Sequence, residues 1–249
     1  MSEPHFPHDA VIRRVDSEPV LFLGGPRALL LQLAHPKVAQ GVAEHSGFES
    51  DPFARLRRTL EATSAIVFGT DDDARRAARH VRSVHGRVTG DGYRANDPEL
   101  LLWVHSTLVD TALRIHRLFL KPLSAPDAEA YYQQSTRVAE LLGVPRSVQP
   151  DDLGAFRAYM RSMVGSLQVS ATARRLAQTV LHPRVPFVTE PAFAVVRHLT
   201  IGLLPPPIRD GYGLSWDPAR RAALSGAMLA SRAVLPLVPG ALRRGIVIA

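Results

Sequence analysis

The chain has 249 residues, which is enough for one large domain with a sizeable core or for two small domains. Apolar residues make up 46% and charged residues 21%, as in globular proteins, and the lack of cysteine excludes disulfides, zinc–thiolate sites and iron–sulfur clusters. The net charge is +7, but acidic residues are interleaved with the arginines and no run of five like charges occurs. This pattern argues against a nucleic-acid partner.

The start of the chain, MSEPHFPHDAVIRR, lacks the apolar segment and the cleavage site of a signal peptide. No apolar run reaches the roughly 18–20 residues that a membrane span needs. We therefore expect a cytoplasmic protein, and a buried helix at residues 193–207, for which peripheral membrane contact is the alternative. Residues 1–18 are polar with prolines at positions 4 and 7, so we expect a flexible arm followed by a single domain over 19–249.

The first half of the domain reads as consecutive helices. Pro26 begins a helix over residues 27–34, and Pro36 ends it or restarts it, which leaves His35 at a junction. Asp51 and Pro52 predict the start of a helix that runs to Gly69. On this helix Arg55, Arg58 and Thr59 stand at i, i+3 and i+4, and so lie near one another.

Residues 72–119 contain the two helices around which we expect the domain to be organised. Thr70 caps the first of them, which carries His85 at the end of an apolar stripe and has Gly86 directly after it. The second begins at Asn96–Pro98, is apolar on almost every side and still carries His105, Thr107 and Asp110. Buried polar groups need partners, because an unpaired one costs about 1–3 kcal/mol. We expect His105 and Asp110 to make internal hydrogen bonds.

Further helices follow over residues 125–142, from Asp151, over 170–181, near 192–203 and over 217–233. Ser124 is the expected cap of the first of these. Residues 182–192 are rich in proline and read as a lid or a crossover, and 234–248 read as irregular and apolar. No pattern with a period of two occurs. The predicted fold class is therefore all-α, a single multi-helix globular domain.

Motifs for common chemistries are absent. The chain contains no HExxH, no GxSxG, no GxGxxG, and no spacing of two histidines and one carboxylate on one helix. His80 and His85 are five residues apart and therefore point from different faces of their helix. These absences disfavour hydrolases and zinc enzymes, and spacing alone does not identify a cofactor site.

Several motifs in order resemble the MpaB/rubber-oxygenase family, which includes the latex-clearing proteins and bacterial proteins once grouped as a domain of unknown function. They are GGPRALLLQLAHPKVAQGVAEHSGF, DPFARLRRT, RSVHGRV, YRANDPELLLWVHSTLVDTALRIHRLF and YYQQSTRVAELLGVP, and they cover residues 19–165. The segments LLPPPIRDGYGLSW and LPLVPGALRR are similar to the C-terminal region of the family.

The resemblance implies an all-helical domain around a buried haem pocket, with haem b held by one histidine, and oxygenase activity. His85 matches the family's haem-iron ligand, and Arg55, Arg58 and Thr59 match its Arg-Leu-x-basic-Thr pattern. In latex-clearing proteins the basic residue of that pattern is a lysine on the distal side of the haem. Arginine effectively does not lose its proton to coordinate iron, so Arg58 argues against rubber cleavage and suggests another substrate or an uncharacterised reaction.

On this basis we expect His85 as the metal ligand, and His105 or Thr107 as the partner of its second ring nitrogen within the cofactor site. Arg55 or Arg58 would stabilise charge that develops on oxygen, and Thr59 would donate a hydrogen bond. Alternatively, one arginine pairs with a haem propionate. The resulting hypothesis is an oxygenase or oxidoreductase that uses haem b and O2 on an apolar or aromatic molecule. The alternatives are a non-catalytic helical protein that carries haem or a small molecule and, less favoured, a basic nucleic-acid binder.

Overall fold

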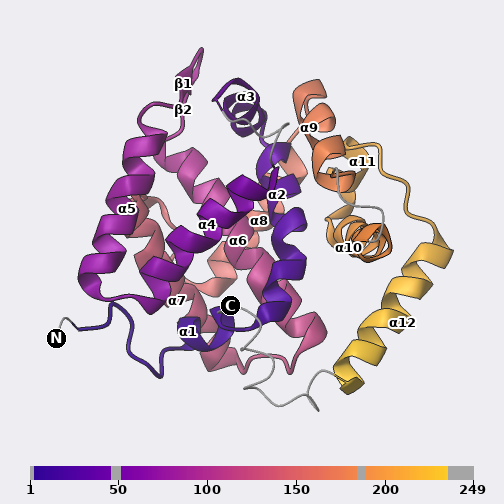
Figure 1. The fold of residues 1–249 in the computed structure, drawn as a ribbon, viewed down its shortest axis with the longest axis horizontal. Helices are drawn as coiled ribbons and strands as arrows, with labels where there is room; N and C mark the ends of the chain where they lie inside the picture. Colours follow the sequence, from indigo (N-terminus) through magenta and orange to yellow (C-terminus); the bar gives the residue numbers. More distant parts are fainter. Residues whose placement is uncertain (1–2, 46–51, 184–188, 235–249) are drawn as a thin grey trace.

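The computed structural model describes residues 3–45, 52–183 and 189–234, with the side chains of 52–56, 227 and 230–234 left aside. These residues form an almost entirely helical fold (Figure 1). Its helices are α1 (Val11–Asp16), η1 (Pro19–Gly24), α2 (Gly25–Ala34), α3 (Pro36–His45), α4 (Pro52–Phe68), α5 (Asp71–His85), α6 (Pro98–Phe119), α7 (Ala125–Leu142), η3 (Arg146–Val148), α8 (Leu153–Ser166), α9 (Ala171–Leu181), α10 (Glu190–Leu203), α11 (Pro206–Gly211) and α12 (Pro218–Val234). The predicted all-α class is confirmed.

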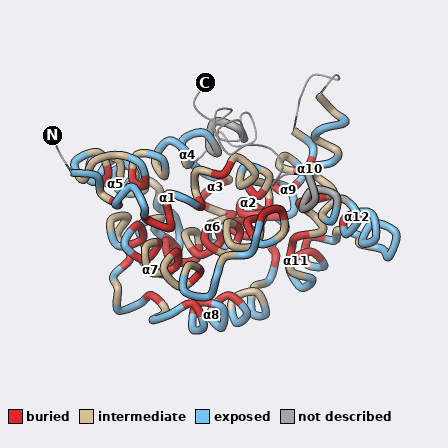
Figure 2. The backbone as a smooth tube through the Cα atoms, turned by 90° about the horizontal axis from the view of Figure 1, so that it is seen from below, coloured by how far each residue is buried: buried red, intermediate tan, exposed pale blue. Residues whose placement is uncertain are grey.

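Helix α6 is the centre of the core, as its apolar sequence predicts. It contacts α1, α2, α7, α12 and η1, and it runs through the buried middle of the molecule (Figure 2). Trp103 is fully buried on α6, and its indole Nε1 donates to the Leu31 carbonyl of α2 over 3.2 Å. A helix that is apolar on most sides is stable only when other helices surround it, and here they do.

Local capping signals fix the helix starts. Thr70 and Asp73 form a reciprocal capping box at the start of α5, because the Thr70 hydroxyl accepts from the Asp73 amide and the Asp73 carboxylate accepts from the Thr70 amide. Ser124 caps α7 by accepting from the Asp127 amide. Both caps confirm sequence predictions. The predicted cap Asp51, residues 184–188 of the proline-rich segment and residues 235–248 lie outside the described residues.

The N-terminal segment corrects one expectation. Residues 3–18 are packed onto the domain instead of forming a loose arm, and Phe6 and Val15 are at most 1% exposed. The Ile12 amide donates to Gln134 Oε1 of α7 over 2.7 Å, and the His5 amide donates to the Gly69 carbonyl. The short apolar set within 11–15 has helical spacing, but the surrounding polar residues and prolines hid it in the sequence.

A short hairpin was also missed. β1 (Thr89–Gly90) and β2 (Tyr93–Arg94) form a short antiparallel hairpin between α5 and α6, in register Gly90 opposite Tyr93. Its turn contains Gly92 at φ +71°, in the left-handed region that glycine adopts readily. Within the described ranges, no helix has the length and apolar character needed to cross a membrane.

Candidate functional site

The α4–α5 helical hairpin carries most of the predicted site. The two helices meet at the turn of Gly69 and Thr70 and diverge towards their other ends (Figure 1). Arg58 and Thr59 are in the N-terminal half of α4, and His85 is the last residue of α5. All three therefore belong to the half of the hairpin that is distant from the turn.

This distant half is poorly covered by the rest of the protein. Near the turn Ile66, Val67, Ala74 and Ala78 are buried, whereas no residue of 57–65 or 79–90 is. Apolar side chains are nonetheless present there, and Leu60 and Val84 are 36% and 46% exposed. Exposed apolar side chains on two neighbouring helices are candidates for covering by a ligand.

The face of α5 that bears His85 carries both apolar and charged residues. Val81 and Arg82 stand at i−4 and i−3 from His85 and so share its side of the helix, whereas Val84, at i−1, projects from a neighbouring side. Val88 lies against α3, because its Cγ1 is 3.6 Å from the point that a Cβ on Gly41 would occupy. His85 itself is half-buried.

The structure describes the side chains of two of the three predicted residues of α4. The Arg55 side chain lies outside the described residues. Arg58 is exposed, and Thr59 is half-buried. Arg58 and Thr59 are consecutive residues in the N-terminal half of α4, directly before the exposed Leu60.

His105 belongs to a polar cluster between α6, α7 and α1. Its imidazole is hydrogen-bonded to the backbone of Ser135, and its Nε2 is buried without a hydrogen-bond partner in the described part of the chain. The Ser135 hydroxyl donates to the Tyr131 carbonyl, and the Tyr131 hydroxyl donates to Asp16 Oδ1 over 3.1 Å. Burial lowers the pKa of His105 to about 4, so its imidazole is neutral at pH 7.

Burial has the same effect on two more histidines. It lowers the pKa of His35, at the α2–α3 junction, and that of His116 on α6. The Nδ1 atoms of both rings are buried with no hydrogen-bond partner in the described ranges. Neutral imidazole is the form that binds metals. His35 and His116, however, belong to other parts of the fold than His85, which is on α5.

Thr107 uses its hydroxyl within its own helix. The side chain is fully buried, and Oγ1 donates to the Val104 carbonyl over 2.7 Å. Such a bond to the preceding turn is common for threonine in helices. The expectation that Thr107 or His105 orients His85 thus stays a prediction, since the hydrogen bonds described for them go to Val104 and Ser135.

The expected internal role of Asp110 is seen in the structure. Arg27 of α2, only 1% exposed, donates to Asp110 over 2.7 Å, to the Thr111 hydroxyl, and from Nε to the Leu203 carbonyl over 2.9 Å. Sequence reasoning missed Arg27. The signal was a single charged residue in the first turn of the apolar helix GPRALLLQLA, where burial requires a counter-charge.

Comparison with known proteins gives the family. Two mycobacterial relatives, the uncharacterized protein Mb2261 of Mycobacterium bovis and the uncharacterized protein Rv2237 of Mycobacterium tuberculosis, are each 29% identical to this chain over 224 residues. The alignments cover 85% of this chain and 87% of each relative. No solved structure matches. The model of the family described as ER-bound oxygenase mpaB/B′/Rubber oxygenase, catalytic domain, matches residues 12–233, and the chain belongs to this family of oxygenases.

Proposed function

We propose that the protein is a haem-b-dependent oxygenase that acts on an apolar or aromatic small molecule with O2. The observation that carries the proposal is the α4–α5 hairpin, whose uncovered apolar half bears His85. The membership in a family of oxygenase catalytic domains supplies the reaction class. The resemblance of RSVHGRV to the haem-binding stretch of that family supplies the ligand.

The residues present fit such a cofactor. A macrocycle needs a large apolar surface, and Leu60, Val81 and Val84 offer one that the fold leaves partly exposed. An imidazole would hold haem iron, and the chain has no cysteine that would compete for it. Haem, when bound, would supply an iron atom that takes up O2.

The side chains of the hairpin would each have a separate role. His85 would hold the iron through a neutral ring nitrogen. Arg58 would stabilise negative charge that develops on oxygen, and Thr59 would donate a hydrogen bond to it. Arg55, one helical turn before Arg58, would share this role or bind a carboxylate of the cofactor.

The substrate follows from the same surface. Apolar residues of the hairpin would bind an apolar or aromatic molecule by burying its surface from water. A guanidinium group does not give up its proton to bind a metal, so an arginine at position 58 could not hold iron as the family's lysine can. We therefore propose a substrate other than rubber.

Absorption spectra of the purified protein, oxidised and reduced, test the cofactor. The wild type, as isolated or after reconstitution with hemin, should show a Soret band that is lost or shifted in His85→Ala. His80→Ala is the matched control, because His80 is exposed on the same helix and should leave the spectrum unchanged. A wild type that binds no haem after reconstitution would refute the proposal, and an unchanged spectrum in His85→Ala would move the ligand elsewhere.

Oxygen uptake separates an oxygenase from the alternative, a non-catalytic haem carrier. With haem bound and a reductant present, an oxygenase should consume O2 faster when apolar or aromatic compounds are added, and Arg58→Gln should slow this uptake. A carrier would show the spectrum without substrate-dependent uptake. Loss of uptake in Arg58→Gln with an unchanged spectrum would place Arg58 in the reaction and not in cofactor binding.

A further inference from the structure

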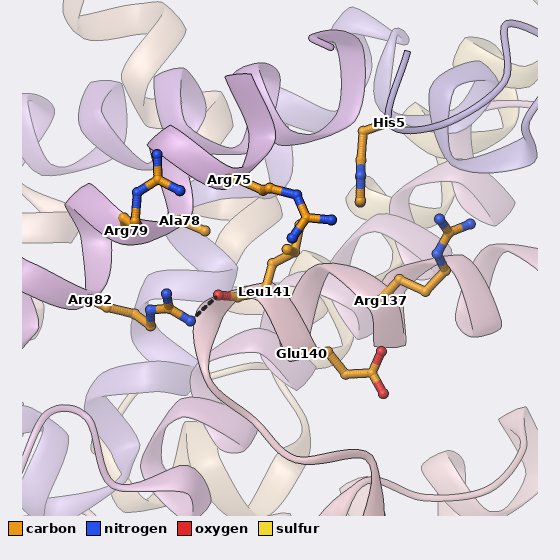
Figure 3. Close-up of a pocket in the computed structure, with 8 residues that line it drawn as sticks. All are labelled: His5, Arg75, Ala78, Arg79, Arg82, Arg137, Glu140 and Leu141. Carbon is orange, nitrogen blue, oxygen red and sulfur yellow. Dashed lines mark hydrogen bonds between the residues drawn. The ribbon is translucent and has the colours of Figure 1, made fainter. Parts of the chain in front are cut away.

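A pocket lies between α5, α7 and the N-terminal segment. Its volume is about 330 Å³, and Figure 3 shows the side chains that surround it. Ala78 and Leu141 line its apolar part, and the remaining lining residues are His5, Arg75, Arg79, Arg82, Arg137 and Glu140. None of the residues proposed for the oxygenase site lines it.

Helix α5 contributes three arginines to one wall of the pocket. Arg75, Arg79 and Arg82 stand at i, i+4 and i+7, which places them on one helix face. Arg75 donates to Asp71 over 2.6 Å, and Arg82 donates to the Leu141 carbonyl over 3.0 Å. Arg79 has no ion pair in the described part of the chain, so its guanidinium is available to a ligand.

Helix α7 contributes a fourth arginine from the opposite wall. The guanidinium carbon of Arg137 lies 5.0 Å from the centroid of the buried Phe6 ring. This stacking restrains the guanidinium plane and leaves its N–H groups unpaired among the described residues. Glu140 is the only carboxylate that lines the pocket, so positive charge dominates it.

His5 places a buried polar atom at the pocket. Its Nδ1 lies 2.8 Å from Asp71 Oδ1, and its side chain is only 9% exposed. The other ring nitrogen, Nε2, is buried without a hydrogen-bond partner in the described residues. In Figure 3 the ring points between Arg75 and Arg137. A buried nitrogen that lacks a partner is unfavourable, and a ligand in this pocket would provide one.

We propose that this pocket binds a small molecule through a phosphate or diphosphate group. Guanidinium groups approach from two walls, and their paired N–H donors match the oxygens of phosphate. A diphosphate presents several acceptor oxygens and so can accept from more than one of the donors that line the pocket. The volume lies at the lower end of small-molecule sites and is too small for a macromolecule.

Isothermal titration with inorganic diphosphate tests the proposal. The wild type should bind it, and binding should weaken as salt is added. Arg79→Gln/Arg137→Gln should bind about a hundredfold more weakly, since each lost charge-assisted hydrogen bond is worth about tenfold. Arg157→Gln/Arg161→Gln, which removes two exposed arginines of α8, is the control and should bind like the wild type.

Vesicles distinguish a free phosphorylated compound from a phospholipid headgroup. Flotation with phosphatidylcholine vesicles, with and without phosphatidic acid, compares the wild type with the same two double variants. Binding of diphosphate in solution supports a soluble ligand. Binding only to phosphatidic acid, lost in Arg79→Gln/Arg137→Gln and kept in the control, supports a headgroup.

Three results would overturn the proposal. The first is no binding of either probe by the folded wild type. The second is equal weakening in the α8 control, which would mean binding by overall charge. The third is loss of haem from Arg79→Gln/Arg137→Gln, which would assign these arginines to the cofactor. If instead haem does not bind to the wild type but diphosphate does, the oxygenase proposal fails and this one stands.

Discussion

Arg27 of α2 donates to Asp110 of α6 over 2.7 Å, and this ion pair joins residues 83 positions apart in the chain. The Arg27 side chain is 2% exposed and that of Asp110 is 32% exposed. The two partners are thus unequal, because Asp110 reaches water and Arg27 does not. Arg114 lies close to both partners. Its own burial lowers its pKa most, the positive charge of Arg27 lowers it further, and the negative charge of Asp110 raises it.

Removing Asp110 should therefore cost more than removing Arg27. Asp110→Asn leaves two guanidiniums near each other without a full counter-charge, and we expect a loss of about 2–4 kcal/mol in unfolding free energy. Arg27→Met removes one of those charges and leaves a carboxylate that water solvates. Urea unfolding followed by circular dichroism measures both.

The double variant Arg27→Met/Asp110→Asn provides the control for this pair. It should be more stable than Asp110→Asn alone, because the stranded charge is gone. Additive losses, or an Asp110→Asn variant as stable as the wild type, would contradict the role of Asp110 as the counter-charge of Arg27.

This ion pair also shows what the sequence could not reveal. Helix starts at Pro52, Thr70 and Ser124 were predictable, because capping depends on residues within one turn. That Asp110 needed a partner was predictable as well, since it lies in an apolar helix. The identity of that partner, Arg27, depends on how α2 packs against α6, and no local pattern encodes such a contact.

The candidate site also combines features that local sequence predicts with contacts that it does not. The hairpin that brings α4 and α5 together is local, so sequence reasoning placed Arg58, Thr59 and His85 on adjacent helices. The surroundings of His105 are not local, because Ser135 and Asp16 come from α7 and α1. The packing of residues 3–18 was missed for a related reason, since a helix of six residues such as α1 is stable only through tertiary contacts.

Gly24 allows η1 to approach α6 closely. A Cβ at this position would lie 2.5 Å from Thr111 Cγ2 and 2.9 Å from Ile115 Cγ1. Gly24→Ala should therefore overpack the core and lower the unfolding free energy by about 1–3 kcal/mol. Differential scanning calorimetry of the variant should show a lower melting temperature.

Gly165 is the matched control for Gly24. It is exposed in α8, and a Cβ there would have no neighbour within 4 Å. Gly165→Ala should stabilise the protein by about 0.5–1 kcal/mol, because alanine favours helix. Equal effects of the two substitutions would contradict the close approach of η1 and α6.

His105 should make the fold sensitive to acid. Its pKa is about 4 in the folded protein because of burial, against an ordinary value of 6.5. The unfolded chain therefore takes up this proton at a higher pH, and stability is lost as pH falls from 6.5 towards 4. His105→Gln should reduce this loss between pH 7 and pH 4.5, measured by urea midpoints. An unchanged difference between the two pH values would contradict a buried, neutral His105.

Asp16 should act in the opposite direction. Burial raises its pKa from 3.8 to about 7, despite the hydrogen bond from Tyr131 that lowers it. The folded protein holds this proton where the unfolded chain has released it, so the contribution is present below about pH 4 and lost as pH rises through 7. Asp16→Asn should therefore leave stability at pH 4 unchanged and raise it at pH 8 by about 1–3 kcal/mol. Asp9→Asn, at an exposed position, should change neither value, and a gain at pH 4 equal to that at pH 8 would rule out titration of Asp16 as the cause.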